Sequence, residues 1–380
     1  MRYARVEKND RELLARNVSV QVRNKTLGTP VRALHLTGSR DCEARQIAGA
    51  KIHELYKSVT MEALRKINGN IDKQQEFTAS FTNAIQSGEP TALNLLFFSC
   101  VTKDGRIPSR RETEYLFDLM NVPNVDVLIP PVIRDANGED YLEFLDQFFT
   151  VYETINHRPV MGLIPYLSYR ELDPILKLYE KHGVVMFAMD LHGKPPLRLA
   201  PNISRVLRSL RKSERDYDEA HYLHGLNVGQ GRALPSQPVK PAKDILIFEM
   251  GFDSFGPAHI PPKLTPDLYG KIDRSKKPPI RLFNRKDYGY YSLHAITSRN
   301  FPHDEGTVAL NQFRASGEYE ELKRLEKVFN AERQTYEAVA VHDRIAGRDG
   351  LQSYLTTKTH IKELVTVLSK FADTVKQSTL

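Results

Sequence analysis

Two acidic residues of this sequence directly follow apolar runs, where a carboxylate can take part in acid–base or nucleophilic chemistry. Asp190 ends the run 184–190 and stands just before Gly193, and Asp253 follows the mostly apolar run 244–252. A carboxylate in such a place can attack an electrophilic carbon or move a proton. Each aspartate also fits a local role, as a helix cap or a turn acceptor. The residue types alone therefore leave both interpretations open.

Further polar and aromatic residues follow neighbouring apolar runs and extend the set of candidates. They are Asp104, Arg106, Tyr166, His192, Lys194, Asn227, Arg232 and Phe255. No HExxH motif or CxxC pair occurs, and the glycine-rich stretch 225–231 does not match a phosphate-binding loop. The sequence thus predicts neither a metal site nor a cofactor.

The elements that must position these residues alternate between two kinds. Short apolar runs predict strands over 91–101, 124–133, 158–167, 184–190, 220–229 and 244–252. The segments between them have helical spacing, over 111–121, 138–156, 168–183 and 202–219. Continuous apolar strands alternating with helices are typical of a parallel sheet covered on both faces. The number of units favours a (β/α)8 barrel of the TIM type, whose sites lie at the carboxyl ends of the strands.

The two ends of the chain complete this division. The segments 18–38 and 279–296 are predicted to supply the remaining strands or an added sheet. After residue 307 the pattern becomes helical. We therefore expect a barrel-like catalytic domain over 1–300 and a helical C-terminal region over 301–380, packed on the barrel or closing it.

Composition limits the class of protein. The chain has 380 residues, of which 41% are hydrophobic and 27% charged, enough for a large core. No apolar run reaches about 18 residues, which predicts no membrane span. The charged first residues and the two distant cysteines lead us to expect a cytoplasmic protein. The formal charge of +7 and the basic stretches 205–215 and 271–281 suit a polyanionic partner, although a solvated surface explains them equally well.

Two stretches of this sequence resemble the tRNA-guanine transglycosylase superfamily. The stretch HYLHGLNVG (221–229) is similar to its tyrosine–leucine–x–glycine strand, and GFDSFG (251–256) to its glycine–x–aspartate–x–phenylalanine–aspartate run. The order of elements over 160–193 is similar as well, and the resemblance covers roughly 90–290. Asp253 matches the first aspartate of the run, but the nucleophilic second aspartate is Gly256 here. The structural zinc site of the family, three cysteines and a histidine, is absent.

The resemblance implies exchange of a guanine in a nucleic acid for a free 7-deazaguanine base. The missing zinc site favours DNA over tRNA, as in the phage and bacterial DNA transglycosylases. One of Asp253 and Asp190 is expected to be the nucleophile and the other to recognise the base, both at one mouth of the barrel. Asp104, Tyr166, His192, Asn227 and Phe255 would hold the substrate, and Arg106, Lys194 and Arg232 the nucleic acid.

Two other functions stay open at this stage. Gly256 at the nucleophile position favours a non-catalytic nucleic-acid-binding subunit. A barrel enzyme acting on a small phosphorylated metabolite is the third hypothesis. The sequence also leaves open whether the chain forms a homodimer or pairs with another subunit.

Overall fold

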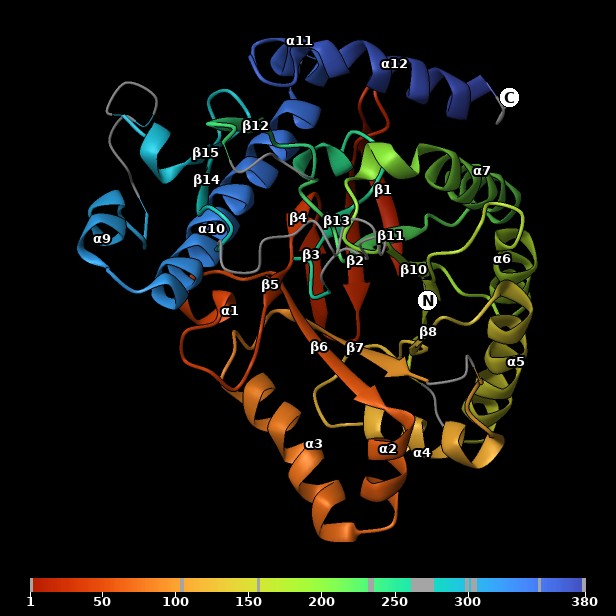
Figure 1. Cartoon of the computed structure of the whole chain (residues 1–380). Helices are drawn as coiled ribbons and strands as arrows, with labels where there is room; N and C mark the ends of the chain where they lie inside the picture. The colour runs from red at the N-terminus through yellow and green to blue at the C-terminus, as the bar shows by residue number, and fades with distance from the viewer. Residues whose placement is uncertain are drawn as a thin grey trace.

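Two parallel sheets form the centre of the protein, as a computed structural model shows (Figure 1). It describes residues 3–102, 106–155, 158–231, 236–260, 277–297, 301, 306–347 and 350–377. The first sheet has the order β4 (Val31–Arg32), β13 (Ser254–Phe255), β11 (Tyr222–Leu226), β10 (Met186–Asp190) and β9 (Met161–Ile164). The second has the order β5 (Leu34–His35), β6 (Ile52–Thr60), β7 (Leu93–Val101) and β8 (Val132–Arg134). All pairs of neighbouring strands in both sheets are parallel.

The chain passes from one sheet to the other in two places. β4 and β5 are separated only by Ala33, whose amide donates to the Phe255 carbonyl of the first sheet (2.8 Å). Farther along the chain, Leu128 and Val160 form an isolated parallel bridge. β9, β10 and β11 are buried at every residue, as expected for parallel strands covered on both faces.

Helices connect successive parallel strands, which confirms the predicted α/β alternation. They are α1 (Glu43–Gln46), α2 (Met61–Asn68), α3 (Ile71–Gln86), α4 (Arg110–Met120), α5 (Gly138–Ile155), α6 (Leu172–Lys181) and α7 (Ala200–Tyr217), with the 3-10 helix η1 (Pro196–Leu199). α4, α5 and α7 lie close to their predicted ranges. α6 starts later than predicted because Ser168 and Glu171 bond to each other in the turn that precedes it.

Two antiparallel sheets flank the parallel ones. One is β1 (Ala4–Asn9), β2 (Arg16–Val22) and β3 (Lys25–Gly28), and the other is β12 (Val239–Pro241), β15 (Gly289–Ser292) and β14 (Arg281–Asn284), followed by η3 (Leu293–Ala295). The segment 18–38 therefore supplies parts of both an added sheet and the parallel sheets, while 279–296 supplies a hairpin.

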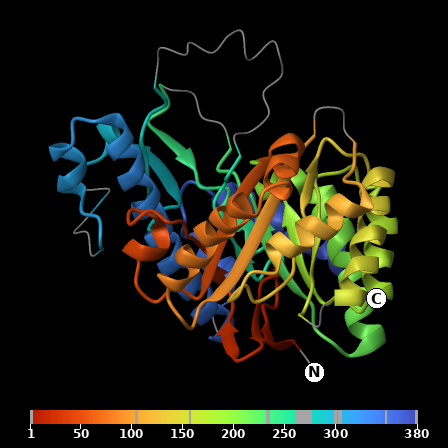
Figure 2. The same cartoon turned by 90° about the horizontal axis from the view of Figure 1, so that it is seen from below.

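The C-terminal region is helical, as predicted. It contains α9 (Leu310–Ala315), α10 (Tyr319–Ala346), α11 (Leu351–Thr356) and α12 (Lys362–Gln377). α10 packs against β2, β4, β14 and α1, and α12 packs against α7. Figure 2 shows α10 and the hairpin on the side of the molecule opposite α5–α7. In the described part of the chain, no helix is long and apolar enough to cross a membrane.

One predicted strand is wrong, and β1, β6 and β12 lie where no strand was predicted. The run 244–252 forms the 3-10 helix η2 (Ile245–Ile247) and a turn at Gly251, whose φ is +92°. Its apolar residues are buried without being extended, and burial alone does not distinguish a strand from a turn. The parallel strand β13 comes only afterwards. β6, the longest of the unpredicted strands, contains His53, Glu54 and Lys57 and so lacks a continuous apolar run.

Candidate functional site

Five polar side chains from both parallel sheets form one connected network. We call Glu54, Asp190, His224, Asn227 and His259 the carboxylate–histidine cluster. Asn227 donates to Asp190 Oδ1 from its Nδ2 (3.0 Å) and accepts from the His259 amide at its Oδ1 (3.0 Å). His259 Nε2 bonds Glu54 Oε1, and His224 Nε2 lies 2.7 Å from Glu54 Oε2. The network therefore links two carboxylates through an amide and a histidine.

The strand register explains why these side chains meet. Asp190 pairs with Leu226 and His224 pairs with Ser254, so Asp190 and His224 stand on the same face of the first sheet. β6 brings Glu54 to that face from the second sheet, beside His35. Asn227 is the first residue beyond β11 and has a positive φ of +54°. That conformation turns the chain at the carboxyl end of the strand, where Asp190 also ends β10.

Glu54 is fully buried and is held by two histidines. Burial alone would raise the pKa of Glu54, but the hydrogen bonds and charges of His224 and His259 outweigh it and lower the pKa to about 2. His224 Nδ1 in turn lies 2.8 Å from Ser254 Oγ, and the His259 ring stacks on Tyr56 with 4.5 Å between the ring centres. The carboxylate is therefore ionised and fixed in position.

Gly256 lies directly against this carboxylate. A Cβ at position 256 would stand 1.7 Å from Glu54 Oε2 and 2.2 Å from its Cδ. Glu54 thus occupies the space that any side chain at position 256 would need. The position at which the resembled family carries its nucleophilic aspartate is a glycine here, and a carboxylate from another strand fills the adjoining space.

Asp190 has the opposite electrostatic setting. Burial raises the pKa of Asp190, and the hydrogen bonds from Asn227 and from the His192 amide (2.8 Å) only partly offset it. One cluster therefore contains a carboxylate whose pKa is lowered, Glu54, and one whose pKa is raised, Asp190. Environments that push two such pKa values apart are the usual basis for dividing acid and base roles.

Several predicted site residues do lie together around Asp190. The Tyr166 ring stacks on His192 with 5.1 Å between the ring centres, and Lys194 Nζ lies 4.0 Å from the centre of the Tyr166 ring. Tyr166 is 41% exposed, so this group reaches the surface. Asp190, Tyr166, His192, Lys194 and Asn227 are brought together by the ends of β9, β10 and β11.

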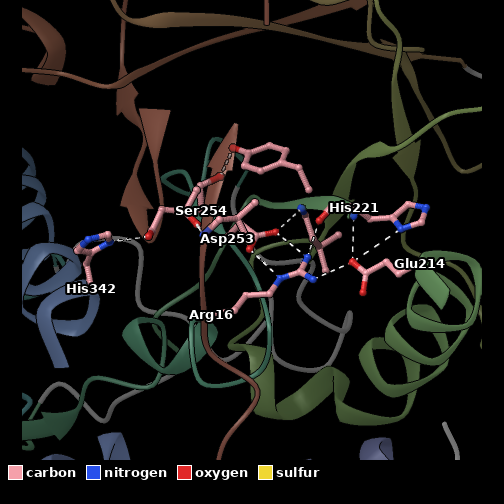
Figure 3. A network of polar contacts seen from close by, with 10 residues as sticks. Arg16, Glu214, His221, Asp253, Ser254 and His342 are labelled. Carbon is pink, nitrogen blue, oxygen red and sulfur yellow. Dashed lines mark hydrogen bonds and ion pairs between the residues drawn. The ribbon is translucent and has the colours of Figure 1, made fainter. Parts of the chain in front are cut away.

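Asp253 lies elsewhere, in a buried ion pair with Arg16 (Figure 3). Arg16 donates from Nε to Oδ1 (3.0 Å) and from Nη2 to Oδ2 (3.1 Å), and it also pairs with Glu214. Ser254, the next residue, points toward His224, so Asp253 points to the opposite face of the strand. Asp253 Oδ2 also accepts a hydrogen bond from the Leu223 amide (2.8 Å). Leu223 lies three residues before Leu226, which pairs with Asp190. The expectation that Asp190 and Asp253 share one pocket is therefore wrong.

The remaining predicted residues do not join the cluster. Phe255 packs between Arg32 and Phe248 on the same outer face as Asp253. Arg106 pairs with Glu112 at 3.2 Å. Asp104 and Arg232 lie outside the described residues, as does most of the basic stretch 271–281. Among the residues that are described, no group of three or more His, Cys, Asp or Glu side chains could hold a metal ion.

Sequence reasoning missed the importance of Glu54, because the strand that carries it was not recognised. His224 and His259 stand near predicted strand ends, but their scatter along the sequence gave no sign that they share a carboxylate. The glycine at position 256 was the available signal. In the resembled family this position carries an acid, and here Glu54 fills the space that a side chain would need.

A cavity of about 390 Å³ adjoins the cluster, between α10 and the ends of β4, β5 and β13. We call it the α10 cavity. It is bordered by His35, Gly256 and His259, so His259 stands between the cavity and Glu54.

Comparison of the sequence with known protein families and with curated proteins finds no match.

Proposed function

We propose that this chain is a base-exchange enzyme that cleaves and re-forms an N-glycosidic bond in a nucleic acid. The base removed would be guanine and the incoming base a 7-deazaguanine, with DNA preferred over tRNA. The observation that carries the proposal is the cluster itself, in which two carboxyl groups with opposed pKa shifts are joined through Asn227 and His259. Glycosidic bonds are commonly broken by such pairs, through an oxocarbenium-like transition state.

In this reaction Glu54 takes the part of the carboxylate that attacks the sugar. One of its oxygens bonds C1′ while the bond from C1′ to the base nitrogen breaks and its electrons pass to the base. Asp190 or His259 supplies the proton that the departing base needs. The incoming base then gives up a proton to the same group, now deprotonated, and its nitrogen displaces Glu54 from C1′. Because His259 holds Glu54 Oε1, its ring must turn aside before that oxygen can react.

We also infer that the two parallel sheets form one closed (β/α)8 barrel. The Leu128 amide donates to the Pro159 carbonyl and the Met161 amide to the Leu128 carbonyl, both at 2.9 Å, which joins the segment before β8 to β9. The Asp126 amide reaches the Asn94 carbonyl of β7 (3.3 Å). With β4 and β5 joining the sheets on the other side, the strands have the same order in space as in the sequence. In such a barrel the cluster lies inside, toward the carboxyl ends of the strands.

Exposed tyrosines beside cations support a nucleic-acid substrate. Tyr166 and Tyr169 are 41% and 49% exposed, and Lys194 and Arg170 lie over their rings. Aromatic faces flanked by cations bind unstacked bases without requiring a particular sequence. The net charge of +7 has the sign that phosphates require.

The test measures incorporation of labelled 7-deazaguanine, and release of guanine, with duplex DNA and with tRNA. We expect incorporation by the wild type, and loss of both incorporation and denaturant-resistant adduct in Glu54→Gln. Asp190→Asn should lower the rate while leaving some adduct. Glu62→Gln, the same substitution at an exposed glutamate of α2, is the matched control. Incorporation by Glu54→Gln at the wild-type rate would refute the assignment. If the wild type binds DNA without exchange, the binding-subunit hypothesis is favoured.

A further inference from the structure

The α10 cavity contains a buried acceptor without a donor. Asp244 borders the cavity and is only 2% exposed. Its Oδ2 accepts from Tyr290 (2.6 Å) and from Gln334 (3.0 Å). Its Oδ1 is buried and has no hydrogen-bond partner among the described residues. An unpaired buried acceptor is costly, so this oxygen is suited to a donor that a ligand brings.

Two cations also border the cavity, Arg32 and Lys327. The Arg32 guanidinium is buried and engaged: Nε donates to Gln334, Nη1 donates to the Ala33 carbonyl, and Nη2 forms an ion pair with Glu43 at 3.6 Å. Lys327 projects from α10 at the rim, and no ion pair involves it in the described part of the chain. The cavity therefore offers an anionic group the ammonium of Lys327.

The other acidic side chains of the lining are already engaged. Glu43 accepts from the His35 amide (3.0 Å). Glu326 accepts from the Arg281 amide (2.7 Å) and from Lys323 (2.6 Å). What the cavity leaves unused is therefore one acceptor at Asp244 and the positive charge of Lys327. A ligand that matches both must carry an N–H donor and an anionic group at separate positions.

We propose that the α10 cavity binds one nucleotide unit, with a ring N–H of its base at Asp244 and its phosphate at Lys327. The volume of about 390 Å³ falls within the range of small-molecule sites, roughly 300–1,000 Å³. The choice of a nucleotide over other bifunctional anions rests on the proposed function, because His259 at the cavity wall would face the glycosidic bond. The unit is either a free mononucleotide or a nucleotide turned out of a nucleic-acid strand.

Isothermal titration calorimetry with guanosine 5′-monophosphate tests the site. We expect binding of the monophosphate, and affinities at least about tenfold weaker for guanosine and for inorganic phosphate. Guanosine lacks the phosphate, and inorganic phosphate lacks the ring N–H. Asp244→Asn and Lys327→Ala should each weaken binding of the monophosphate by about tenfold. Lys73→Ala, which removes an exposed lysine of α3, is the control and should leave the affinity unchanged. Melting temperatures of all variants check that each is folded.

Two further points of the design identify the source of the nucleotide and keep this test independent of the proposed function. Competition by a short single-stranded oligonucleotide identifies a strand as the source, and its failure to compete identifies the free mononucleotide. The titration requires no turnover, so absence of base exchange leaves this test unaffected. Absence of binding by the folded wild type at millimolar monophosphate would overturn the site. Wild-type affinity in both Asp244→Asn and Lys327→Ala would overturn it as well.

Discussion

Replacing Gly256 with alanine directly tests the close contact between β13 and Glu54. The added Cβ would lie 1.7 Å from Glu54 Oε2, whereas ordinary contacts begin at 3.4 Å. The carboxylate must therefore move by about 1.7 Å, the difference of the two distances. A movement of that size breaks its bond to His224 (2.7 Å) and disturbs the bond to His259.

The cost follows from the interactions that the movement disrupts. Overpacking a buried site costs about 1–3 kcal/mol, and each hydrogen bond to a charged group is worth about 1.5–3 kcal/mol. Because the chain relaxes in part, we expect Gly256→Ala to lower the free energy of unfolding by about 3–5 kcal/mol. In a Glu54→Ala background the same substitution meets no carboxylate and should cost less than about 1 kcal/mol.

The assay is urea denaturation followed by far-ultraviolet circular dichroism on the four proteins of this double-mutant cycle. Gly38→Ala is the matched control, since a Cβ there would meet nothing within 4 Å. It reports the small effect that losing a glycine has on the unfolded chain. Equal costs of Gly256→Ala with and without Glu54 would refute the reasoning, as would a cost below about 1 kcal/mol in the wild type.

Three other predictions concern separate parts of the molecule. Asp253→Asn should lower the free energy of unfolding by about 3–5 kcal/mol in urea titrations, because it leaves the buried Arg16 guanidinium poorly paired; a stable variant without base exchange would instead return Asp253 to the reaction. Glu249 is fully buried, and burial raises its pKa from 4.5 to about 8, so the folded state retains a proton that the unfolded chain loses. Stability should therefore fall as the pH rises from about 4.5 to 8, by at most about 1.4 kcal/mol per pH unit, and Glu249→Met should flatten this part of the pH profile of urea unfolding; an unchanged slope would contradict the assignment. DNA binding should weaken steeply with salt in a fluorescence-anisotropy titration, and Lys194→Ala should reduce the salt dependence; binding that does not respond to salt would exclude phosphate contacts as its basis.

The sequence alone was sufficient for the general class of fold. Apolar runs between segments of helical spacing predicted parallel strands covered by helices, and the runs that became β9, β10 and β11 are buried throughout. Asp190 and Asn227 were proposed as site residues because each stands at the end of such a run. The strand predictions succeed because burial on both faces selects apolar residues locally, so the pattern is present in the sequence itself.

Only the tertiary structure decided which groups meet. Glu54 and His224 are 170 residues apart in sequence, and they touch because two sheets turn the same face toward each other. Asp253 was misplaced for a related reason. Neighbouring side chains of a strand point to opposite faces, so Ser254 joins the cluster and Asp253 joins Arg16. One-residue differences in register decide which face a side chain occupies, and register depends on pairing with strands that are remote in the sequence.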